Sequence, residues 1–234
     1  MLRIIVIILV IFAAVAAVMK KKLTIGGGIA GFLVATSIYV GTGYLGLLLL
    51  AVFFLSAVWA TKHKQSYKEA LKGIPAHSQQ RDAWQVLANG GVAAFVAGIL
   101  LFELSIKELE IIVAASLAAA TADTLSSELG TVYGKRFYNI LSFKRDQRGL
   151  DGVVSLEGTL IGAAGAAMIA LIYACFHPRL RDPVIIFIGG ILGNYFDSLL
   201  GAAFERKGWI KNDMVNFLTT GIAAVIAFIL ISFL

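Results

Sequence analysis

The sequence predicts an all-α integral membrane protein with about eight transmembrane helices in one polytopic domain, residues 1–234. Hydrophobic residues make up 59% of the chain and charged residues only 15%, whereas about a quarter of the residues of a water-soluble domain are charged. A membrane-spanning helix needs about 20 mostly apolar residues, and such stretches recur through the whole sequence. The predicted spans are residues 2–19, 23–40, 44–61, 84–102, 109–131, 153–176, 183–204 and 214–234.

The first span is predicted to be a retained helix rather than a cleaved secretory signal. Ala14 and Ala16 imitate the small residues of a cleavage site. The flanking charges favour retention, because only Arg3 precedes the apolar run whereas Lys20–Lys22 follow it. This order of charges is typical of a helix whose N-terminus lies outside the cell.

The basic residues test the number of spans, because Lys and Arg gather in cytoplasmic loops. When alternate loops are assigned to opposite sides, all but four of the 20 basic residues fall on one side. The excess positive charge is therefore a signal of topology and does not predict nucleic-acid binding. The sequence predicts a cell-membrane protein with both termini outside, whose cytoplasmic loops carry Lys20–Lys22, the basic residues from Lys62 to Arg81, those from Lys135 to Arg148, and Arg206, Lys207 and Lys211.

Polar residues inside the spans gather near the predicted cytoplasmic face. At 1.5 Å per residue, Asp123 lies about 12 Å below the cytoplasmic end of its helix, and Asp197 stands at a similar depth. An ionisable side chain within a span marks a functional site by default. The same layer contains Thr124, Glu128, Asn194, Ser198, Asn89, Ser155, Glu157, Asn212, Asp213 and Asn216.

A weak internal repeat relates the last two pairs of helices. Asp123-Thr124-Leu125 matches Asp197-Ser198-Leu199, and the pattern that begins at Asp151 matches the one that begins at Asn212. Both matches run in the same direction, so the sequence predicts a parallel repeat about an axis along the membrane normal. Such a repeat would bring the carboxylates of Asp123 and Asp197 within reach of one metal ion.

The residue types in this layer favour a site for a hard cation. Carboxylates, hydroxyls and amides are ligands suited to Mg²⁺, whereas the single cysteine, Cys175, excludes a Cys-based zinc site and an intrachain disulfide. Basic loops flank the layer. A metal ion bound by carboxylates, with cationic side chains nearby, is typical of sites that catalyse phosphoryl transfer. The loop cations that we predict to bind phosphate are Arg81, Lys135, Arg145 and Arg148.

Structural roles remain open for the same residues. Asp123 and Asp197 could pair with buried polar groups, or bind protons or Na⁺ in a transporter. Glu128 and Asp213 lie near enough to the interface to be solvated, and Glu157 suits the start of a helix because of the helix dipole. The asparagines could join helices by hydrogen bonds. The loop cations could act only as topology signals.

Five motifs in the C-terminal two thirds of the chain resemble the transmembrane-protein-19-like membrane family, which includes the plant phytyl-phosphate kinases. The resemblance implies a CTP-dependent kinase that converts an isoprenyl monophosphate to the diphosphate. One departure is Gly149-Leu150-Asp151-Gly152, where the family usually has Gly-Thr-Asn-Gly. The motifs are Gln85-Val86-Leu87-Ala88-Asn89-Gly90, the run from Ala119 to Gly130, Gly152-x-Val154-Ser155-Leu156-x-Gly158-Thr159, Asp197-Ser198-Leu199-Leu200-Gly201-Ala202 and Asn212-Asp213-x-Val215-Asn216-Phe217.

We therefore hypothesise a phytyl- or geranylgeranyl-phosphate kinase with a cytoplasm-facing Mg²⁺ site. Its partners are an isoprenyl monophosphate, a nucleotide triphosphate with CTP as co-substrate, and membrane lipids; a homodimer is left open. A secondary transporter is the chief alternative, and a lipid-phosphate cytidylyltransferase or phosphatase is another. The predicted catalytic residues are Asp123, Asp197, Glu128 and Glu157, of which Asp123, Asp197 and Glu128 bind the metal. The predicted substrate-binding residues are Arg81, Asn89, Thr124, Lys135, Arg145, Arg148, Ser155, Asn194, Ser198, Asn212, Asp213 and Asn216.

Overall fold

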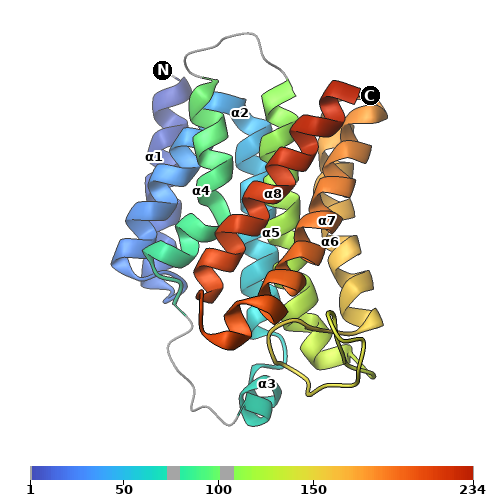
Figure 1. Ribbon diagram of the computed structural model, residues 1–234. Coiled ribbons are helices and arrows are strands. Elements are labelled where there is room, and N and C mark those ends of the chain that lie inside the picture. The colour runs from blue at the N-terminus through green and yellow to red at the C-terminus, as the bar shows by residue number, and fades with distance from the viewer. Residues whose placement is uncertain (1, 73–79, 101–107, 234) are drawn as a thin grey trace.

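The computed structural model describes residues 2–72, 80–100 and 108–233, and within them the chain is almost entirely helical. Long helices cross the molecule side by side, and a short helix and loops lie at one end (Figure 1). One small antiparallel ladder joins two strands of two residues each. The elements are α1 (Leu2–Met19), α2 (Ile25–Lys62), α3 (Gln65–Lys72), α4 (Ala83–Ile99), α5 (Glu108–Tyr133), β1 (Tyr138–Asn139), β2 (Val153–Val154), α6 (Leu156–Phe176), α7 (Arg181–Ala203), the 3₁₀ turn η1 (Glu205–Lys207) and α8 (Asn212–Phe233).

Helix α2 is folded into a hairpin at Gly43. A straight helix of its 38 residues would be about 57 Å long, yet Lys22, just before its start, and Lys62, at its end, line the same pocket. Gly43 has φ 68° and ψ −149°, a combination that is open essentially only to glycine. The first arm (residues 25–42) and the second arm (residues 44–62) therefore run in opposite directions (Figure 1).

Helix α5 forms the centre of the bundle and is buried along most of its length. Its alanines let neighbouring helices approach closely. A Cβ atom added at Gly190 or Gly193 of α7 would lie within 3 Å of the Cβ atoms of Ala118 and Ala119 respectively. Such small-residue seams replace the hydrophobic driving force that helices lack in lipid. Glycine and alanine therefore line the contact between α5 and α7.

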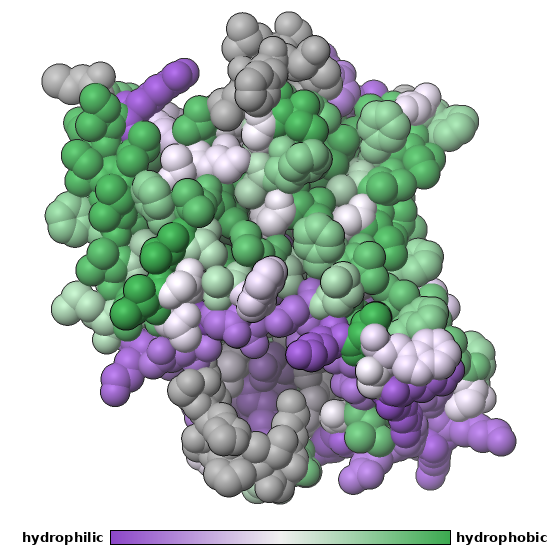
Figure 2. Space-filling model, turned by 60° about the vertical axis from the view of Figure 1, so that its left-hand side comes forward, coloured by the Kyte–Doolittle hydropathy of each residue, from purple (hydrophilic) through white to green (hydrophobic). Residues whose placement is uncertain are grey.

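The surface and the helix lengths identify a multi-pass integral membrane protein. Six of the described helices, α1, α2, α5, α6, α7 with η1, and α8, are long and apolar enough to cross a membrane, and α4 is a shorter apolar helix of 17 residues. On the face shown in Figure 2, hydrophobic residues form a broad band, and hydrophilic residues gather below it. The fold class is therefore confirmed as all-α integral membrane, while the number of crossings and the division into one domain stay predictions.

Helix boundaries differ from the predicted spans by at most three residues where the structure describes them. The predicted spans 23–40 and 44–61 correspond to the two arms of α2. Helix α6 starts at Leu156 rather than at residue 153, because Val153–Val154 pairs with β1 and Ser155 caps the helix. Residues 101, 102 and 234, which the predictions placed in spans, lie outside the described residues.

Both chain ends lie at one end of the bundle, which we call the terminal end (Figure 1). The opposite end, the basic end, has helix α3 and the loops of residues 20–24, 134–155 and 204–211 (Figure 1). The loops that the charge pattern placed together on one side of the membrane thus share one end of the molecule. Which compartment this end faces stays a prediction.

Candidate functional site

Two aspartates from neighbouring helices meet near the basic end. The carboxyl groups of Asp123 on α5 and Asp197 on α7 lie close enough together for a side-chain hydrogen bond between them. The packing explains their meeting, since Gly193 of α7 lies against Ala119 of α5, and each aspartate follows four residues later on helices that run in the same direction. The predicted closeness of these two carboxylates is observed. The parallel repeat from which it came stays a prediction.

Asn216 of α8 stands at the same level as this pair. Gly193 of α7 faces the backbone oxygen of Thr219 on α8, and α8 runs opposite to α7. Asn216 lies one turn before Thr219, and Asp197 lies one turn after Gly193, so both are one turn nearer the basic end. Oδ1 of Asp197 and Oδ1 of Asn216 are both buried without a hydrogen-bond partner among the described residues.

These oxygens fit a Mg²⁺ ion. Buried polar atoms are nearly always paired in proteins, so two unpaired acceptor oxygens beside two carboxylates suit a ligand that brings positive charge. Among the described residues, no group of three or more His, Cys, Asp or Glu side chains is arranged to hold a metal. Mg²⁺ does not require one, because it is usually bound by one or two carboxylates together with substrate phosphates and water.

Glu128, predicted as a metal ligand, has a different partner in the structure. Its Oε2 accepts a hydrogen bond from Nζ of Lys68 at 2.5 Å. The same ammonium donates to the backbone oxygens of Ala60 and Thr61 at the end of α2, where a cation complements the helix dipole. Glu128 lies within electrostatic range of Asp123, but its carboxylate is committed to holding α3 against the bundle.

Arg81 is a predicted phosphate-binding cation that lies within electrostatic range of Asp123. It interacts electrostatically with Asp123 and Glu128, and its guanidinium lies 5.9 Å from the ring centre of Phe53. Burial lowers the pKa of Arg81, because a low-dielectric surrounding disfavours the charged form. The guanidinium of Arg81 is therefore partly buried in the protein and is not a fully solvated surface cation.

Several predicted polar residues on α4, α5, α6 and α7 are held by local hydrogen bonds or are buried. Asn194 Oδ1 accepts from Ser126 at 3.0 Å, and Asn89 Nδ2 donates to the backbone oxygen of Gln85. Ser155 accepts from the backbone nitrogen of Gly158 as the cap of α6. The other residues of this kind are Thr124, which is buried on α5, and Ser198, whose hydroxyl lies 3.5 Å from the backbone oxygen of Asn194.

The structure gives the remaining predicted residues other surroundings. Glu157 accepts from the backbone nitrogen of Lys135 at 3.2 Å, and Lys135 itself is exposed. Arg148 donates to Tyr67 and to the backbone of Gly134, which ties α3 to the loop after α5. The others are Arg145 and Asn212, which are exposed, and Asp213, which is half-buried at the start of α8.

Comparison with known proteins identifies the family. The family described as Integral membrane protein DUF92 matches residues 8–224. The chain belongs to this family. The uncharacterized membrane protein MJ0933 of Methanocaldococcus jannaschii is 35% identical over 202 residues, 86% of this chain and 81% of its own. Protein VTE6, chloroplastic, of Arabidopsis thaliana is 30% identical over 221 residues, 91% of this chain and 66% of its own. No solved structure matches.

Two further acids of this DUF92 protein approach the pair. Glu205 and Asp151 both interact electrostatically with Asp197. Gly152 brings Asp151 there, because it has φ 70° and lies so close to Ala202 that a Cβ atom would overlap the backbone of α7. The sequence analysis did not select Glu205. Its spacing of eight residues from Asp197 was an available signal, since such a spacing keeps two residues on one helical face.

Proposed function

We propose that this protein is a membrane isoprenyl-phosphate kinase that transfers a phosphoryl group from CTP to phytyl or geranylgeranyl phosphate. The observation that carries the proposal is the close pair Asp123 and Asp197, with an unpartnered buried oxygen and with Arg81 nearby. The resemblance of its motifs to the transmembrane-protein-19-like family, which includes the phytyl-phosphate kinases, supports this choice. Membership of the DUF92 family agrees with a membrane-embedded enzyme.

The reaction needs alignment and charge neutralisation more than it needs a base. An oxygen of the isoprenyl monophosphate attacks the γ-phosphorus of CTP, and the bond between that phosphorus and the β,γ-bridging oxygen breaks. CDP leaves with the bridging oxygen and its electron pair. A phosphate monoester has a second pKa near 6, so the acceptor is already largely a dianion and no proton is lost.

The chain's own residues have distinct parts in this proposal. Asp123 and Asp197 hold Mg²⁺, which neutralises charge on the nucleotide phosphates when it is bound. Arg81 stabilises the negative charge on the transferred group, as preorganised cations do in phosphoryl transfer. Asn216 supplies an amide oxygen beside the carboxylates. Glu128 keeps Lys68 and α3 in place.

The two halves of the surface match the two halves of the substrate. The apolar band suits an isoprenyl tail that enters from the lipid, and the hydrophilic end below it suits a phosphate head and a nucleotide (Figure 2). The proposal places the basic end in the cytoplasm, where the nucleotide is available, in agreement with the positive-inside rule.

The test is a turnover assay with purified protein, labelled CTP, Mg²⁺ and either phytyl or geranylgeranyl phosphate. The proposal expects the isoprenyl diphosphate and CDP as products. Asp123→Asn and Asp197→Asn should abolish their formation, while Glu110→Gln, which alters an acid at the terminal end, should not. A nucleotide-linked lipid would identify a cytidylyltransferase, and free alcohol would identify a phosphatase. Absence of diphosphate with every nucleotide tried would refute the kinase.

A further inference from the structure

An open pocket at the basic end brings together three cationic side chains from distant parts of the sequence. It is lined by Lys22, Lys62 and Arg81, with Val58 and Thr61, and the empty space among these residues, which includes some open solvent, is about 240 Å³. The α2 hairpin creates it, because the start and the end of α2 return to the same place. The segment before α4 adds Arg81.

The cations of this pocket lack the acidic partners that neighbouring cations have. Lys68 pairs with Glu128 and Arg206 pairs with Asp146. In the described ranges, no ion pair joins Lys22, Lys62 or Arg81 to an acidic side chain.

The contact of Lys22 is instead with another cation. Its side chain lies close to that of Lys62, and this second cation lowers the pKa of Lys22. Two ammonium groups held together repel each other. An anion bound between them would remove that repulsion.

The backbone fixes two of the three cations before any ligand arrives. The backbone nitrogen of Arg81 donates to the oxygen of Lys22, and the nitrogen of Thr24 donates to the oxygen of Arg81, both at 3.0 Å. Gly27 makes this pairing possible, because a Cβ atom there would overlap the carbonyl oxygen of Arg81. A site whose charges are already in place loses less entropy when a ligand binds.

We propose that Lys22, Lys62 and Arg81 form a binding site for a phosphate or polyphosphate group. The site adjoins the aspartate pair, since Arg81 lines the pocket and also interacts electrostatically with Asp123. Resting on the proposed kinase function, it holds either the nucleotide phosphates or the phosphate head of the lipid. Both ligands have the same anionic oxygens, which lysine and arginine bind by charge-assisted hydrogen bonds.

The binding test needs no turnover. Full-length protein in neutral detergent is titrated with inorganic pyrophosphate by calorimetry. The variant Lys22→Met/Lys62→Met should bind at least about tenfold more weakly, the loss that about 1.4 kcal/mol of interaction gives. Lys22→Arg/Lys62→Arg should retain binding because it keeps the charges. Lys20→Met is the matched control, since it removes an exposed lysine from the same loop. Equal pyrophosphate affinity of the wild-type and double-methionine proteins would overturn the site.

Kinetics then identify the source of the phosphate. In the kinase assay, a raised KM for CTP in the double-methionine variant assigns the site to the nucleotide, and a raised KM for the isoprenyl phosphate assigns it to the lipid. Normal KM values for both substrates would reject the site while leaving the kinase intact. If no diphosphate forms but pyrophosphate binding still depends on Lys22 and Lys62, the kinase fails and the anion site stands.

Discussion

The acids at the two ends of helices α5 and α7 have different neighbours. At the terminal end, Glu110 of α5 lies 3.5 Å from His177, whose ring stacks on Tyr173, and Asp182 accepts from the neighbouring Arg181 at 3.1 Å. Near the basic end, the same helix α5 and its neighbour α7 bring two aspartates against each other. The first arrangement places each acid beside a basic side chain, whereas the second opposes folding by repulsion whenever both groups are charged.

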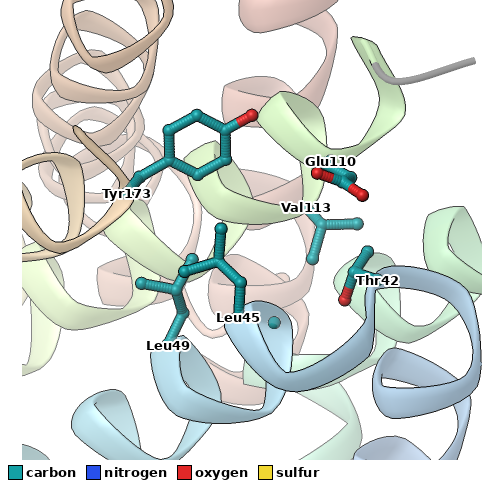
Figure 3. A pocket seen from close by; sticks show the side chains of 7 residues that line it. Thr42, Leu45, Leu49, Glu110, Val113 and Tyr173 are labelled. Carbon is teal, nitrogen blue, oxygen red and sulfur yellow. The ribbon is translucent and has the colours of Figure 1, made fainter. Parts of the chain in front are cut away.

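The cavity at the terminal end strengthens the contrast. Tyr173 and Glu110 border a small pocket whose other walls are mainly apolar, with Leu45, Leu49 and Val113 (Figure 3). The hydroxyl of Thr42, which also lines the pocket, donates to the backbone of its own helix. The basic end instead combines the unpartnered acceptor oxygens of Asp197 and Asn216 with Lys22 and Lys62, which form no described ion pair. An arrangement that costs stability without serving the fold indicates function, which supports the proposal that the chemistry takes place at the basic end.

The largest expected effects, on kcat and on melting temperature, come from replacing an acid by its amide at the basic end or at the terminal end. Asp123→Asn and Asp197→Asn should lower kcat by at least about a thousandfold, because a phosphoryl-transfer site loses charge stabilisation, while the melting temperature stays equal or rises. Glu110→Gln should do the reverse and lower the melting temperature with kcat unchanged. Turnover assays and thermal unfolding in detergent measure both quantities. If Asp197→Asn instead lowered the melting temperature and left turnover normal, Asp197 would serve the fold rather than the reaction.

The sequence predicted the helices and the aspartate pair because both depend on local patterns. Apolar length set the spans, and the match of Asp123-Thr124-Leu125 with Asp197-Ser198-Leu199 predicted that the two aspartates lie close together. Contacts that depend on the docking of distant segments were not predictable. Lys22 and Lys62 meet only because α2 folds at Gly43, and Glu128 meets Lys68 only because α3 packs on α5.

The next effect concerns the ion pair between Lys68 and Glu128 near the basic end. Lys68→Met should destabilise the protein by about 1–3 kcal/mol, since it leaves Glu128 half-buried and unpaired. Lys68→Met/Glu128→Gln should recover much of that loss, because the stranded charge is removed. Unfolding free energies of the wild type, both single variants and the double variant form the required cycle. Strictly additive losses would show that the pair is not coupled.

A smaller effect on stability is expected when the glycines near the two ends of the first arm of α2 are replaced by alanine. Gly43→Ala should cost about 1–2 kcal/mol because alanine does not adopt its φ of 68° without strain. Gly26→Ala, at the basic end of the same arm, should be neutral or slightly stabilising. A Cβ atom at Gly26 meets nothing closer than 3.7 Å, and alanine favours helix. Thermal unfolding of both variants decides the point, and equal melting temperatures would show that the hairpin tolerates a side chain at its bend.

The smallest expected change in melting temperature comes from removing the ion pair between Arg206 and Asp146 at the basic end. The hydrogen bond to Arg206 lowers the pKa of Asp146, so the pair stabilises the folded protein above the ordinary Asp pKa of about 3.9. That contribution is lost as the pH falls through the lowered folded value, because the protonated carboxyl no longer attracts the guanidinium. The melting temperature of Arg206→Gln should therefore be slightly below wild type at pH 7 and converge with it in acid. Arg145→Gln, which removes an exposed arginine without a described ion pair, should show no such convergence. If the gap persists below the folded pKa of Asp146, Arg206 contributes through packing rather than charge.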